Sequence, residues 1–254
     1  MKSLIKAEIQ KLKYPYLISI FIAAIYSVLV IISVLHGYSY TYNIEVWEES
    51  GELFRIIFPI FAVLPTTWLM FYERKNGFLS YTITRVSKKK YIILKWLVSS
   101  IGGAFIVFII SFLGLIVCLY FIPDVVSQGT DSAIDKFAGD FFVNHPFIYG
   151  FLLSIWRLFI GFLIASLGFV ISLYVNNIFI VLTGPFVYAI LENFSLSILG
   201  APYYRLVTSF DPNTLQETAI SIERLIVGPL FLIVFTSGII TYFALIKKEN
   251  IYEL

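Results

Sequence analysis

The sequence predicts an all-α integral membrane protein with six transmembrane helices, from its composition and from the way its apolar residues are grouped. Of the 254 residues, 59% are hydrophobic and only 13% are charged, and the mean hydropathy is +0.89. Soluble domains are nearer half apolar and one quarter charged. The apolar residues fall into six runs, most of which reach the roughly 20 residues that a helix needs to cross a bilayer. We therefore expect a single transmembrane domain over residues 1–254.

Residues 1–14 precede the first span and predict a short amphipathic helix at the membrane interface. Leu4, Ile5, Ile9 and Leu12 share one face of a helical wheel, and lysines cover much of the rest. A signal peptide is the alternative, because a basic start precedes an apolar run. The run over residues 17–35 is longer than the apolar core of a usual signal peptide, however, and no small-residue cleavage site follows it. We therefore expect an uncleaved first span.

The expected spans are separated by polar segments. Spans two and five are the least regular, because Pro59 and Pro65 interrupt the second and Gly184-Pro185 the fifth; proline is tolerated where neighbouring groups satisfy the freed carbonyls. The fifth span either re-enters the membrane from the outer side after Glu192 or continues as one helix. In order, we expect spans at about residues 15–36, 53–72, 96–122, 147–174, 178–199 and 225–246.

Positive charge is divided unequally between the two sides of this layout. The N-terminal segment, the loop after span two and the tail hold 13 of the 18 Lys and Arg residues. The polar loops on the other side, residues 37–52, 123–146 and 200–224, are acidic, and residues 218–224 suit a short surface helix. Lys and Arg collect in cytoplasmic loops next to spans. We therefore expect both termini to lie in the cytoplasm.

The loop after span two, residues 73–95, is the most basic segment, with seven Lys and Arg residues against one acid, Glu73. Asn76-Gly77 is a turn signal. The apolar residues within 78–83 suit a short surface helix, and Ser87 suits the N-cap of the next span. The alternative is a basic linker that only fixes the orientation of the spans.

This pattern resembles the cytoplasmic loop of type-2 ATP-binding-cassette transporter permeases. In that family an acid opens the loop, a Gly follows four residues later, and a short apolar coupling helix then seats on a separate ATPase subunit. Two positions depart from the family pattern, since Phe78 replaces a usual Thr and Arg85 a frequent Pro. The residues that match are Glu73, Arg74, Asn76, Gly77, Leu79, Val86, Ser87, Lys88, Tyr91 and Lys95. The resemblance implies an ATPase contact through Glu73, Gly77, Phe78, Leu79, Tyr81, Thr82, Ile83 and Arg85.

The resemblance further implies the transmembrane subunit of a bacterial exporter in the cytoplasmic membrane. Two permease subunits, identical or different, would work with two ATPase subunits, which would bind ATP and Mg²⁺; this chain would hydrolyse nothing and hold no cofactor. Permeases of this size belong to peptide-export, lantibiotic-immunity or bacitracin-resistance systems, so the implied substrate is an amphipathic peptide, antibiotic or lipid. Aromatic residues make up 18% of the chain, which suits such a substrate, although aromatics also fill span cores and interfaces. Membrane lipid is an expected partner and nucleic acid is not.

The residues themselves carry little catalytic chemistry. No Gly is followed by Lys, so the chain has no Walker A loop, and it has neither an H-E-x-x-H nor a G-x-S-x-G motif. The single cysteine, Cys118, cannot form an internal disulfide or a thiolate cluster, and we expect no metal site. An ion-coupled secondary carrier or an integral membrane enzyme is the alternative function.

Two charged residues lie well inside expected spans, Arg157 in the fourth and Glu192 in the fifth, and each is the only charged residue of its span. Intramembrane charges are costly and usually find a partner. At 1.5 Å per residue, Arg157 lies roughly 15 Å from the outer side and Glu192 roughly 24 Å from the cytoplasmic side, so both fall in the outer half. The tight turn at Asn176-Asn177 makes the two helices neighbours. We expect an ion pair that braces the outer gate; the alternative is that each side chain reaches separately to headgroups or loop carbonyls.

Overall fold

A computed structural model of the chain describes residues 2–36, 40–84, 86–123, 136–214 and 221–242. These residues form helices and connecting turns and contain no strand. Six helical segments are long and apolar enough to cross a membrane, which confirms the predicted fold class of a multi-span membrane protein. They are α1 (Lys2–Leu35), α2 with α3 (Asn43–Val63 and Thr67–Lys75), α5 (Lys88–Tyr120), α7 (Pro146–Tyr174), α8 (Ile178–Ile198) and α10 (Ile222–Thr241).

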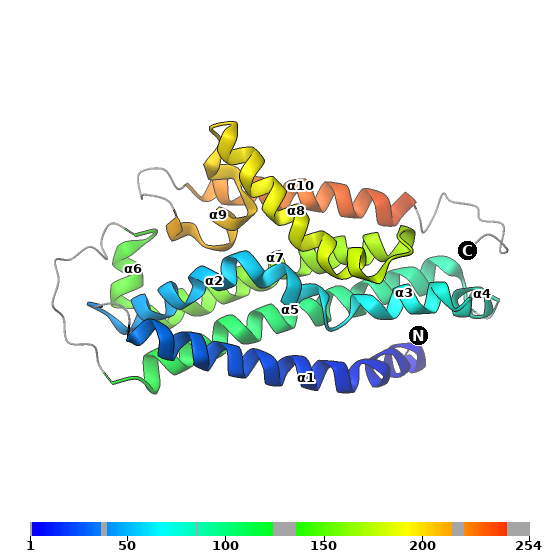
Figure 1. Cartoon of the computed structure of the whole chain (residues 1–254), viewed down its shortest axis with the longest axis horizontal. Coiled ribbons are helices and arrows are strands. Elements are labelled where there is room, and N and C mark those ends of the chain that lie inside the picture. The colour runs from blue at the N-terminus through cyan, green and yellow to red at the C-terminus, as the bar shows by residue number, and fades with distance from the viewer. Residues whose placement is uncertain (1, 37–39, 85, 124–135, 215–220, 243–254) are drawn as a thin grey trace.

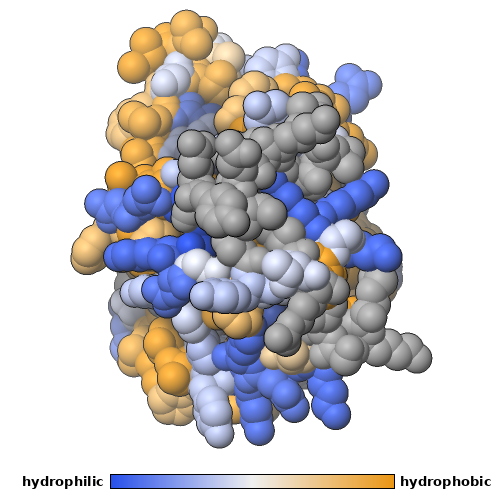
Figure 2. Space-filling view, turned by 90° about the vertical axis from the view of Figure 1, so that its right-hand side faces the viewer, coloured by the Kyte–Doolittle hydropathy of each residue, from blue (hydrophilic) through white to orange (hydrophobic). Residues whose placement is uncertain are grey.

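The long helices form an elongated bundle with two distinct ends (Figure 1). The short helix α4 (Phe78–Ile83) lies at one end, where α1 begins and α10 finishes. The short helix α6 (Gly139–Asn144) lies at the other. We refer to these as the α4 end and the α6 end. Figure 2 looks onto the α4 end, where hydrophilic residues gather across the face and hydrophobic side chains flank them.

Small and hydroxyl-bearing residues join α5 to α7 in the middle of the bundle. Ser100 is hydrogen-bonded to Ser166, and Ser111 to Ser154, each pair at 3.0 Å between the hydroxyl oxygens. Gly103 faces α2 and α7 so closely that a Cβ atom there would clash with both. Such residues let membrane helices approach and hold them with interhelical hydrogen bonds. The apolar side chains of α2, α5 and α7 fill the core around these contacts.

Helix α1 runs without interruption from Lys2 to Leu35, through Pro15. The N-terminal segment is therefore the first part of the span helix rather than a separate interfacial helix. An ion pair explains the difference, because buried Glu8 contacts Lys95 of α5 at 2.6 Å and holds the first turns of α1 against the bundle.

Helix α2 begins at Asn43, whereas the sequence placed the start of this span near residue 53. Glu45 accepts the backbone N–H groups of Thr41 and Tyr42 at 2.8 and 3.2 Å and so caps the start of the helix. Acidic side chains are favourable near a helix N-terminus because of its dipole. The expected polar loop is therefore partly helix. Glu45 lies in the first turn of α2, and Glu48, Glu49 and Glu52 follow along the helix.

Helix α8 is continuous through Pro185 and Glu192, as in the second of the two alternatives for span five. The chain turns at Gly200, whose φ of +70° lies in the region that favours glycine. It then returns into the bundle as η2 (Pro202–Tyr204), α9 (Leu206–Phe210) and η3 (Pro212–Thr214). The Phe210 ring stacks on that of Phe58 in α2, with 4.1 Å between the ring centroids. Residues 202–214, which we call the returning segment, were expected in a polar loop but are partly core.

Candidate functional sites

Gly77 begins the short helix at the α4 end of the bundle. Its φ of +69° lies in the left-handed region, which glycine adopts without steric cost. The turn separates α3 from α4, as the Asn76-Gly77 signal predicted. Leu79 is fully buried among residues of α3, α5 and α7, whereas Phe78 and Tyr81 are 45% and 75% exposed. Helix α4 therefore has a buried anchor and an exposed aromatic face.

A buried charge network lies close to α4 and joins three helices. Glu73 of α3 contacts Lys95 of α5 and Lys11 of α1, the latter at 2.9 Å, and it accepts a hydrogen bond from Tyr91 at 2.6 Å. Glu8 of α1 contacts the same two lysines, at 2.6 Å for Lys95 and 3.0 Å for Lys11. Buried charges are costly to leave unpaired. Here two carboxylates face two ammonium groups, so the charges are matched within the network.

This arrangement separates the residues expected to contact an ATPase into two groups. Phe78 and Tyr81 are exposed, and Gly77 and Thr82 are partly exposed. Glu73 and Leu79 are buried inside the chain, where they support α4 from within. The side chain of Ile83 and the whole of Arg85 lie outside the described residues.

Sequence reasoning missed Glu8 as a partner of this loop. A signal was present, because Glu8 is the only acid in the first 44 residues and stands among lysines. On a helix it shares a face with Leu12, four residues later, and both side chains are buried.

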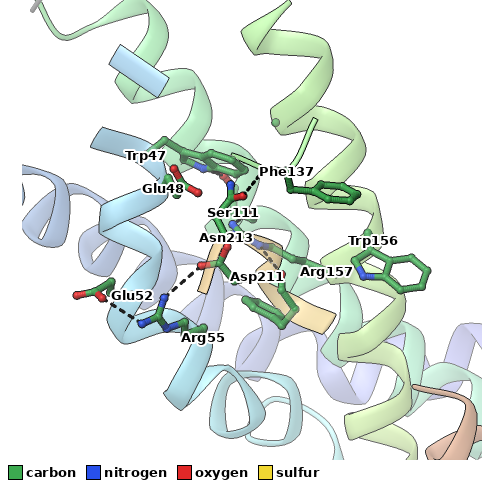
Figure 3. Close-up of polar contacts among 12 residues, drawn as sticks. Trp47, Glu48, Glu52, Arg55, Ser111, Phe137, Trp156, Arg157, Asp211 and Asn213 are labelled. Carbon is green, nitrogen blue, oxygen red and sulfur yellow. Dashed lines mark hydrogen bonds and ion pairs between the residues drawn. The ribbon is translucent and has the colours of Figure 1, made fainter. Parts of the chain in front are cut away.

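The second site surrounds Arg157, in the first half of α7 (Figure 3). Arg157 is only 1% exposed. Its Nε donates to the carbonyl of Phe210 at 3.2 Å, its Nη1 donates to Ser111 Oγ at 3.0 Å, and its Nη2 lies 3.9 Å from Asp211 Oδ1. The guanidinium carbon lies 4.7 Å from the Trp47 ring centroid, close enough for a cation–π interaction.

Further polar contacts connect this site to the α6 end. Arg55 of α2 lies 3.6 Å from Asp211 and 3.0 Å from Glu52. Asn213 Oδ1 accepts the backbone N–H of Phe137 at 2.7 Å. Its Nδ2 donates to the Tyr149 hydroxyl at 3.2 Å. The returning segment is thus joined by polar contacts to α2, to α7 and to the residues just before α6.

The structure gives Arg157 and Glu192 separate partners rather than an ion pair with each other. Arg157 faces Asp211, just after α9, whereas the Glu192 carboxylate accepts the N–H of Leu206, at the start of α9, at 2.9 and 3.2 Å. The reason is the return of residues 202–214 into the bundle, which the sequence layout had placed in a polar loop. The apolar residues Leu206, Val207 and Phe210 were the available signal, because a fully solvated loop would not need them.

The space beside Arg157 is too small for a substrate. A cavity of about 20 Å³ borders the guanidinium and is lined by residues of α1, α2, α5 and α7. Ligand pockets usually measure about 300–1,000 Å³. We therefore interpret the Arg157 site as one that stabilises the fold rather than one that binds a substrate. Within the described part of the chain, no group of three His, Cys, Asp or Glu residues is placed to hold a metal ion.

Comparison with protein-family models, with curated proteins and with solved structures finds no match to this chain. The geometry of these two sites and the pattern of the loop that contains α4 are therefore the features that bear on the function.

Proposed function

We propose that this chain is the membrane-spanning subunit of an ATP-binding-cassette exporter. The observation that carries the proposal is α4, a short helix between the second and third candidate spans, preceded by a left-handed glycine and exposing Phe78 and Tyr81 at one end of the bundle. Exposed aromatic side chains are enriched where proteins contact partners. The loop that contains α4 is also the most basic segment of the chain, which favours the cytoplasmic side, where an ATPase would bind.

The buried surroundings of α4 support a role in transmitting force. Leu79 belongs to the same buried cluster as Met70 of α3, Tyr91 of α5 and Phe169 of α7, so a displaced α4 would disturb a cluster shared by three helices. The charge network of Glu8, Lys11, Glu73 and Lys95 adds α1 to this group. Movement between distant sites is carried by such contiguous packing and charge contacts. In this proposal an ATPase closing on ATP moves α4, and the connected helices switch the access of the transport pathway.

An apolar cavity at the α6 end supports an amphipathic substrate. It measures about 280 Å³ and lies between the start of α7, the start of α10 and the residues around α6. Four of the residues that line it are aromatic, Phe137, Phe141, Tyr149 and Trp156. Apolar and aromatic walls of this size suit the apolar group of a peptide, antibiotic or lipid.

Site-specific photo-crosslinking tests the proposal. A photoreactive phenylalanine analogue at Tyr81, in cells of the source organism, should crosslink to a protein that mass spectrometry identifies by a Walker A peptide. The same analogue at Ile18, which is 60% exposed on α1 and outside α4, is the control and should not capture that protein. An ATPase that is absent from the Tyr81 adducts, together with transport driven by an ion gradient, would contradict the proposal and favour an ion-coupled carrier.

A further inference from the structure

A long apolar groove lies between α1 and α5, near the α4 end of the bundle. Its volume is about 670 Å³, and its lining is almost entirely apolar. Helix α1 contributes Ile5, Ile9, Leu12, Lys13, Tyr16 and Leu17, and helix α5 contributes Ile93, Leu94, Leu97, Val98, Ile101 and Gly102.

The dimensions of the groove fit one leaflet of a bilayer. The twelve steps from Ile5 to Leu17 extend about 18 Å along the helix, close to the roughly 15 Å that is half of a hydrocarbon core. Tyr16 crosses between the helices toward the inner part of the groove, where its hydroxyl donates to the Gly102 carbonyl at 2.9 Å. The groove therefore runs along the helices from the α4 end into the candidate spans.

Lysine side chains lie beside the groove. Lys13 lines it about 12 Å along α1 from Ile5, and exposed Lys6 lies at the α4 end, beside Ile5 and Ile9 in an adjoining hollow of α1. Lys90 is exposed on α5 one turn before Ile93 and Leu94, on the same helix face. The acids of this region, Glu8 and Glu73, are buried and paired with Lys11 and Lys95. They do not offset the positive charge at the groove.

We propose that this groove binds an anionic phospholipid, with one acyl chain along α1 and α5 and the headgroup phosphate at the α4 end, near Lys6 and Lys90. The apolar lining suits the acyl chain, and the two exposed ammonium groups at the α4 end suit a negative headgroup. Clusters of Lys at a membrane surface select anionic lipids in this way. The site goes beyond the proposed transport function and is independent of it, because it requires only that the bundle spans a membrane.

Native mass spectrometry of the purified, delipidated full-length protein tests this site. The protein is titrated with dioleoylphosphatidylglycerol and, separately, with dioleoylphosphatidylcholine, and the first bound lipid is quantified. We expect the anionic lipid to bind first at a concentration about fivefold lower. In the double variant Lys6→Gln/Lys90→Gln this preference should disappear. Leu97→Trp, which fills the groove, should weaken the first binding event for both lipids by about tenfold.

Matched controls separate this site from general membrane charge and from protein association. Lys75→Gln removes an exposed lysine of the same end outside the groove, and Val234→Trp adds a ring to an exposed position of α10; both should bind like the unaltered protein. Equal affinity for the two lipids, or lipid binding unchanged in the groove variants, would overturn the proposal. A groove variant that altered the number of protomers in the spectrum and left lipid binding unchanged would show that a second copy of the chain occupies the groove instead.

Discussion

Arg157 and Asp211 face each other in the interior of the bundle, with 3.9 Å between Nη2 and Oδ1 and with only 1% and 2% of their side chains exposed. Arg55 of α2 approaches the same carboxylate to 3.6 Å. Asp211 belongs to the returning segment, so one buried carboxylate joins this segment to α2 and α7. These contacts explain how a segment expected in a polar loop is held inside the bundle.

Removing one member of this pair should destabilise the protein strongly. We expect Asp211→Asn to lower the free energy of unfolding by about 3–5 kcal/mol, because it leaves the buried Arg157 without an ion-pair partner. Arg157→Met should cost less, because Arg55 still faces the Asp211 carboxylate at 3.6 Å. The double variant should lose less than the sum of the two, with a coupling of at least about 1 kcal/mol. The free energies of unfolding of the unaltered protein, the two single variants and the double variant are measured in detergent by circular dichroism. Fully additive losses would show that the two charges do not stabilise each other.

Arg157 and Glu192 should behave differently, because they contact different groups. The cycle of Arg157→Met and Glu192→Gln is expected to give a coupling no larger than about 0.5 kcal/mol. Glu192→Ala should cost about 1 kcal/mol, since it removes the acceptor for the Leu206 N–H at the start of α9. Glu192→Gln keeps an acceptor oxygen and should cost less than Glu192→Ala. A large coupling in the same unfolding assay would instead indicate the direct ion pair that the sequence suggested.

The spans were predictable where local signals mark the helix ends. Pro146 begins α7, and the Asn177 side chain accepts the N–H of Phe179 at the start of α8. Both helices begin within one residue of the expected positions, 147 and 178. The start of α2 was misplaced because Glu45 and Glu48 suggested a solvated loop. In the structure Glu45 lies in the first turn of the helix, where the helix dipole favours an acid, and Glu48 is buried and paired with Lys136.

The buried polar sites were predictable only in part. Glu73 and Gly77 were recognised as parts of a structured loop because they lie close together in sequence. The partner of Glu73 on α1, Lys11, is 62 residues away, and Arg157 and Asp211 belong to different helices and turns. Helical periodicity relates residues three or four apart, but no such rule relates side chains that meet only after the bundle has assembled.

Gly103 should tolerate no side chain where α2, α5 and α7 meet. A Cβ atom at this position would lie 1.9 Å from the Ala62 carbonyl oxygen and 2.9 Å from the Ala165 Cβ. Overpacking costs about 1–3 kcal/mol or more, so Gly103→Ala should lower both the melting temperature and the yield of folded protein. Gly238→Ala on α10, where a Cβ atom would meet nothing within 4 Å, is the control and should be neutral. Equal stability of the two variants would contradict the close approach of these helices.

The orientation of the bundle can be tested with single cysteines in a Cys118→Ser background. Ser87 is exposed beside α4, and Ser221 is exposed at the start of α10, at the opposite end of the bundle. From the distribution of Lys and Arg we expect Ser221→Cys to react with an impermeant maleimide on intact cells and Ser87→Cys to react only after permeabilisation. Labelling of Ser87→Cys on intact cells would reverse the orientation and remove α4 from the reach of an ATPase.

Substitutions on the two faces of α4 should separate an effect on folding stability from an effect on ATP hydrolysis by a bound ATPase. Leu79→Ala is expected to lower the free energy of unfolding by about 2–5 kcal/mol, because it opens a cavity among Met70, Tyr91 and Phe169. Tyr81→Ala should change it by no more than about 0.5 kcal/mol, since the ring is 75% exposed. If α4 contacts an ATPase, Tyr81→Ala should nevertheless reduce substrate-stimulated ATP hydrolysis by the assembled complex. Normal hydrolysis in a stable Tyr81→Ala protein would mean that the loop only connects two spans.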